Sequence, residues 1–99
     1  MKKYVLLHMG FKTPTPEIME AWGMWFESIE DKTVDTGVGF GEAREITRDG
    51  SKELPWGLDS ITGYTIISAE NLDEAEEIAK TCPFITGIRV YEARSMESD

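Results

Sequence analysis

The sequence has one cysteine, one histidine, few positive charges and no long apolar run. Its single cysteine, Cys82, excludes an intrachain disulfide. A lone histidine, His8, without clustered cysteines or aligned carboxylates falls short of any zinc ligand set. We therefore expect no metal, and no motif indicates another cofactor. No segment approaches the roughly 20 apolar residues of a membrane-spanning helix, so we expect no membrane partner.

Positive charge is scarce relative to negative charge. The chain carries 10 Lys and Arg against 19 Asp and Glu, a formal net charge of −9. A protein that binds nucleic acid needs cations facing phosphates, so this balance excludes nucleic acid as a partner. The basic start and the apolar run 4–7 are too short for a signal peptide, and His8 interrupts them. With one unpaired cysteine, the chain is expected in the reducing cytoplasm.

Length and periodicity predict one domain over residues 1–99 with six elements. Helices are expected to begin after Thr15, which is followed by Pro16, and after Asn71, which Glu74 completes as a capping box. Strands are expected over 3–9, near 41–48, over 61–69 and over 85–94. The order β-α-β-β-α-β predicts an α+β, ferredoxin-like fold with both helices on one face of a four-stranded antiparallel sheet of strand order 4-1-3-2.

The first predicted helix combines an aromatic stripe with a glycine. Trp22 and Trp25 recur at helical spacing with Ile18 and Ile29, which places them in the core. Gly23 costs about 1 kcal/mol relative to alanine inside a helix. We interpret it as a sign of close packing.

Strand alternation sorts side chains onto the two faces of the predicted sheet. The purely apolar set of the first strand is expected to face the helices: Val5, Leu7 and Met9. The mixed set is expected on the open face with two residues of the last strand: Tyr4, Leu6, His8, Arg89 and Tyr91. A contiguous exposed apolar patch is typical of an interface, so we expect a homodimer, or a higher even oligomer, formed through this face.

Several segments resemble the YCII-related, or DGPF-domain, proteins. The main likeness lies in 63–75 (GYTIISAENLDEA) and 79–84 (AKTCPF), and the ends 3–7 and 91–94 are similar as well. The resemblance implies a dimeric α/β barrel in which two sheets enclose a cleft.

The resemblance also implies a shared His–Asp pair, with dehydrochlorinase-like enzymes among the relatives. This chain departs from that pattern: Cys82 stands where the family has an Asp before the Pro, and no histidine occurs within 22–26. The Asp-Gly-Pro-Phe signature is also broken, because Asp49-Gly50 continues into Ser51-Lys52.

His8 is the candidate catalytic residue, because histidine alone titrates near neutral pH without a special shift. The loop with Trp56 and Asp59 is expected to return to the edge where the first strand ends. Asp59 could then orient His8 as a general base. The alternative is a histidine hydrogen-bonded within the dimer interface. Candidate substrate-binding residues are Tyr4, Trp22, Trp56, Arg89 and Tyr91.

Two functions stay open. The first is a non-catalytic homodimer that binds a small molecule in a cleft on the open sheet face. The alternative is a small lyase, similar to dehydrochlorinases, that uses His8 as its general base. The broken His–Asp pair favours the first. Cys82 ends a helix on its buried side, away from cations, and is interpreted as an inert packed thiol.

Overall fold

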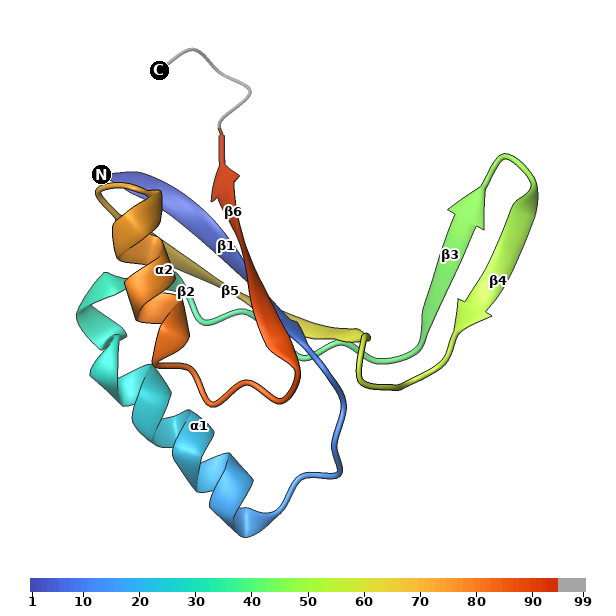
Figure 1. Cartoon of the computed structure of the whole chain (residues 1–99), viewed down its shortest axis with the longest axis horizontal. Coiled ribbons are helices and arrows are strands. Elements are labelled where there is room, and N and C mark those ends of the chain that lie inside the picture. The colour runs from blue at the N-terminus through green and yellow to red at the C-terminus, as the bar shows by residue number, and fades with distance from the viewer. Residues whose placement is uncertain (95–99) are drawn as a thin grey trace.

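Two α-helices and a four-stranded antiparallel sheet form an α+β structure compatible with a ferredoxin-like fold (Figure 1). The computed structural model describes residues 1–94. The sheet has the order β2-β5-β1-β6, and its strands are β2 (Thr33–Asp35), β5 (Ile61–Ala69), β1 (Lys2–Met9) and β6 (Gly87–Ala93). The helices are α1 (Pro16–Ser28), the short 3-10 helix η1 (Glu30–Lys32) and α2 (Leu72–Lys80).

The remaining strands, β3 (Ala43–Thr47) and β4 (Gly50–Leu54), form a hairpin of their own. The expectation that 41–48 joins the main sheet is therefore wrong, and β2 lies beside β5 instead. The Asp49-Gly50 turn explains the difference, because Gly50 adopts a positive φ of 134° and lets the chain fold back on β3 at once. The hairpin projects away from the sheet and helices (Figure 1), and every residue of its two strands is exposed.

The start of α1 follows the predicted capping pattern. The Thr15 hydroxyl accepts the Ile18 backbone N–H at 3.2 Å, and Pro16 occupies the first helical position. On the side facing α2, the Trp25 indole N–H donates to the Thr81 hydroxyl at 2.9 Å. None of the helices within residues 1–94 is long and apolar enough to cross a membrane.

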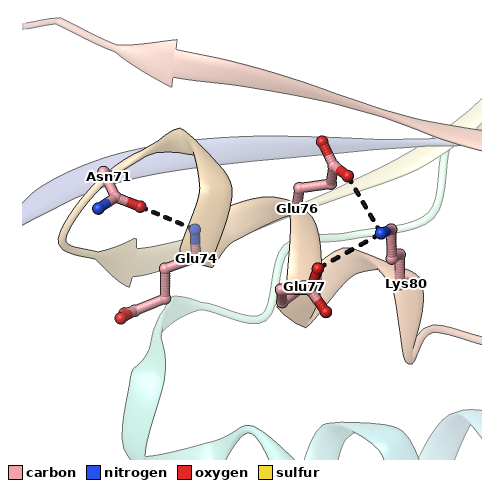
Figure 2. A network of polar contacts seen from close by, with 5 residues as sticks. All are labelled: Asn71, Glu74, Glu76, Glu77 and Lys80. Atoms are coloured by element: carbon pink, nitrogen blue, oxygen red, sulfur yellow. Dashed lines mark hydrogen bonds and ion pairs between the residues drawn. The ribbon is translucent and has the colours of Figure 1, made fainter.

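The start of α2 is capped by Asn71, whose side-chain oxygen accepts the Glu74 N–H at 2.8 Å (Figure 2). The capping box differs from expectation in one bond. The Glu74 carboxylate accepts the N–H of Glu70, at 3.3 Å, rather than that of Asn71. At the other end of α2, Lys80 forms ion pairs with two glutamates on the exposed side of the helix, Glu76 and Glu77 (Figure 2).

The faces of β1 are the reverse of those predicted. Tyr4, Leu6 and His8 are buried beneath the helices, with 1%, 0% and 8% of their surfaces exposed. Val5, Leu7 and Met9 are half-buried and belong to the open face. In β6, Arg89 and Tyr91 lie on the open face as expected, where they pair with Leu7 and Val5.

The reversal is explained by His8, the polar residue of the buried set. Burial of His8 requires partners for its two ring nitrogens. Thr65 of β5 and Cys82 beyond α2 supply them. Alternation within β1 separates the two sets of side chains, but the partners that decide which set is buried come from distant elements.

Candidate functional site

A cavity of about 820 Å³ lies beside α1, at the end of the sheet where β1 ends and β5 begins. Its lining includes Trp22, Gly23 and Phe26 of α1. His8 and Thr65 also line it, and both belong to the helix-covered face of the sheet. Met9 and Tyr64 of the open face line it as well. The cavity therefore lies at the end of the sheet, where it reaches the helix-covered face, and not on the open face alone as the sequence led us to expect.

Aromatic side chains surround the mouth of the cavity. Four of them line it while 41–45% of their surfaces remain exposed: Phe11, Phe40, Trp56 and Phe84. The rings of Phe11 and Trp56 lie 5.4 Å apart, and Phe40 stacks on Tyr64 at 5.9 Å. Contiguous exposed apolar surface of this kind marks a site for a ligand or partner.

Trp56 reaches the cavity because its loop is held against the end of β1. The Gly10 N–H donates to the Ser60 carbonyl at 2.8 Å, and the Phe11 N–H donates to the Gly57 carbonyl at 3.0 Å. This arrangement confirms the expectation that the loop carrying Trp56 returns to the edge where the first strand ends.

The segment 36–40 forms another wall and depends on a glycine. Gly37 has a φ of +76°, and a Cβ there would collide with the backbone carbonyl of Tyr64. Only glycine combines this conformation with such a close approach to β5. The Asp35 carboxylate stabilises the turn by accepting the Gly37 N–H at 2.8 Å.

His8 lies at the inner end of the cavity and is fully hydrogen-bonded within the protein. Its Nε2 lies 2.9 Å from the Thr65 hydroxyl, and its Nδ1 lies 3.9 Å from the Cys82 sulfur. The Thr65 hydroxyl donates its one proton to the Thr36 carbonyl at 3.3 Å, so it accepts from His8. On this ground we assign the proton of His8 to Nε2, with Nδ1 accepting from the Cys82 thiol.

Burial determines the protonation states of His8 and Cys82. Desolvation lowers the pKa of His8 to about 4 and raises the pKa of the Cys82 thiol to about 12. Both groups are neutral at pH 7. Cys82 is a buried thiol, in agreement with the sequence interpretation. The indole ring of Trp22 meets the imidazole edge-on, with 4.9 Å between ring centroids.

Three of the predicted site residues meet at the cavity: His8, Trp22 and Trp56. They come from β1, α1 and the loop after β4, so the fold brings together residues far apart in sequence. Two backbone hydrogen bonds hold the Trp56 loop to the end of β1, and they bring Trp56 to the same cavity as His8.

The other predicted site residues lie elsewhere. Asp59 is exposed outside the cavity lining, and the polar partners of His8 are Thr65 and Cys82, so the expected His8–Asp59 pair does not form. Tyr4 is buried in the core. Arg89 and Tyr91 are exposed on the open face of the sheet.

Sequence reasoning missed the significance of Gly23. Its interpretation as a close-packing site is wrong, because a Cβ at Gly23 would meet nothing within 4 Å. A helix-interior glycine that costs about 1 kcal/mol and contacts nothing instead leaves open space in the cavity wall. The glycine itself was the available signal. Thr65 and Phe84 carried none that separates them from ordinary strand and loop residues.

Within residues 1–94, no group of three or more His, Cys, Asp and Glu side chains is placed to hold a metal ion. Neither protein-family models nor curated protein sequences give a match to this chain. The YCII-related resemblance stays a prediction.

Proposed function

We propose that this chain binds a small, largely apolar molecule in the cavity beside α1. The observation that carries the proposal is an aromatic-lined cavity of about 820 Å³. This volume falls within the roughly 300–1,000 Å³ of small-molecule sites, which are mostly apolar with few polar groups. The open space beside Gly23 supports the proposal, since a Cβ at this position would meet nothing within 4 Å.

Binding is favoured over catalysis by the state of His8. An effective general base has a pKa near the working pH, and burial lowers the pKa of His8 to about 4. Both ring nitrogens are also hydrogen-bonded within the protein, to Thr65 and Cys82. The lyase alternative, with His8 as general base, would have to break one of these bonds. We therefore propose a binding protein without proton transfer by His8.

We further propose that the chain forms a cytoplasmic homodimer through the open face of the sheet, as a dimeric α/β barrel of ferredoxin-like halves with strand order 4-1-3-2. With β2 as the second strand, the observed order β2-β5-β1-β6 supports this arrangement. The reversal of β1 changes the residues of the interface. Half-buried or exposed apolar and aromatic side chains occupy this face: Val5, Leu7, Tyr64, Ile66 and Tyr91.

The binding proposal is tested with the neutral fluorophore N-phenyl-1-naphthylamine, whose emission rises in apolar surroundings. We expect saturable binding with one site per chain. Gly23→Leu should remove the binding, because its side chain enters the open space while leucine remains a good helix former.

Gly23→Ala is the matched control. A single methyl group meets nothing within 4 Å, so this variant should still bind the fluorophore. Circular dichroism establishes that both variants are folded. If Gly23→Leu binds as well as the unchanged protein, the fluorophore lies elsewhere and the cavity is not the binding site.

A further inference from the structure

The cavity has a charge distribution unlike that of the chain. Asp and Glu make up 19 of the 99 residues. Within residues 1–94, however, the lining contains no carboxylate and one lysine, Lys12. Lys12 is exposed in the segment that follows β1. An acidic protein thus presents a local cation at the mouth of an apolar site, where it attracts anions.

The polar side chains at the inner end of the cavity already have hydrogen-bond partners within the protein. The Nε2 proton of His8 is donated to Thr65, and Nδ1 accepts from Cys82. Within the described residues, no buried side-chain nitrogen or oxygen lacks a partner. A polar ligand group placed beside His8 would be buried without a partner, which is costly. This end of the cavity therefore favours an apolar part of the ligand.

We propose that the ligand is a small aromatic carboxylate, with its ring inward against Trp22 and its carboxylate at the mouth beside Lys12. This inference rests on the proposed binding function and adds the class and orientation of the ligand. The space in front of Gly23 accommodates the ring, since nothing lies within 4 Å of a Cβ at this position.

The test compares 2-naphthoate with the neutral 2-naphthamide by equilibrium dialysis at about 0.1 M salt. The two compounds share a ring system, so their difference in affinity isolates the effect of the carboxylate charge. We expect naphthoate to bind about fivefold more tightly, as for a surface ion pair. Added salt should weaken naphthoate binding and leave naphthamide binding nearly unchanged.

Lys12→Gln should reverse the preference, because the net charge of −9 then becomes −10 and repels naphthoate without local compensation. Lys32→Gln makes the same change in net charge at an exposed residue of η1 that does not line the cavity. It should keep the preference for naphthoate. This pair of variants separates a local effect of Lys12 from the overall charge.

The outcomes distinguish this inference from the binding function. Equal affinity for the two compounds in the unchanged protein would overturn the inference and leave the binding function intact. Binding of neither compound, with the neutral fluorophore still bound, would do the same. A Lys12→Gln protein that still prefers naphthoate would overturn the assignment of the carboxylate to Lys12.

Discussion

His8 is the residue on which the local arrangement depends most. It joins three elements through its contacts, with Thr65 in β5, Cys82 beyond α2 and Trp22 in α1. Each partner suits a neutral imidazole, because one nitrogen donates and the other accepts. A proton added to Nδ1 would leave the Cys82 thiol facing an N–H donor. Protonation of His8 therefore opposes the folded structure.

The first prediction concerns acid stability. The imidazole takes up its proton near pH 6.5 in the unfolded chain and near pH 4 in the folded protein. Between these values the unfolded state binds more protons, so the free energy of unfolding falls as the pH drops from 6.5 to 4. The full loss from His8 is on the order of 3 kcal/mol. Urea unfolding at a series of pH values measures it.

His8→Gln is the control for this pH dependence. The variant is expected to be less stable at pH 7, yet its free energy of unfolding should fall less between pH 6.5 and 4. Carboxylates affect both proteins alike, so the difference between the two curves isolates His8. Parallel curves, or a pKa near 6.5 for His8 measured by NMR in the folded protein, would contradict the prediction.

At the scale of single elements, β1 places two adjacent leucines in opposite surroundings. Leu6 is completely buried beneath the helices, and Leu7 is half-buried on the open face. Leu7 lies between Tyr64 of β5 and Arg89 of β6. The same substitution at the two positions should therefore have different effects.

The second prediction compares Leu6→Asp with Leu7→Asp. Leu6→Asp buries a carboxylate without a partner, and we expect it to lower the free energy of unfolding by at least about 3 kcal/mol. Leu7→Asp should leave the fold intact and convert the proposed dimer to a monomer. Thermal unfolding and sedimentation at micromolar concentration measure the two effects. If the protein without any substitution sediments as a monomer, the open-face interface is ruled out.

The elements with strong local signals could be predicted from the sequence. Thr15 and Asn71 mark the helix starts by their side-chain chemistry, and the β-branched run 61–69 has the bounds of β5. The second strand of the hairpin was missed, because β4 reads GSKEL and lacks strand-forming residues, although Asp49-Gly50 is a turn signal in the sequence. Its pairing follows from the Asp49-Gly50 turn rather than from the propensity of the strand.

The candidate site was predictable only in part, because the contacts that bury His8 come from residues far away along the chain. His8 and Trp56 could be placed together because a loop must return to the end of the first strand. Burial of His8 depends on Thr65 and Cys82, which lie 57 and 74 residues away along the chain. No local pattern in β1 reports partners at that separation.

At the scale of the whole molecule, the chain is more extended than its length suggests. Its Cα radius of gyration is 14.8 Å, compared with about 13 Å for a typical 100-residue domain. The β3–β4 hairpin contributes to this larger radius, since it projects away from the sheet and helices (Figure 1). An isolated two-stranded hairpin is marginally stable in water.

The projecting hairpin has a consequence for the rates at which backbone amides exchange hydrogen for deuterium. Its strands can separate without disturbing the main sheet, so their amides should exchange through small, frequent openings. In contrast, β5 is paired on both sides, with β1 and β2, and its amides at Ile66 and Ile67 should exchange only when the whole fold opens. One molecule would then contain a fast-exchanging sheet and a slow-exchanging sheet. Only in the slow sheet would the opening free energies calculated from the protection factors equal the global free energy of unfolding.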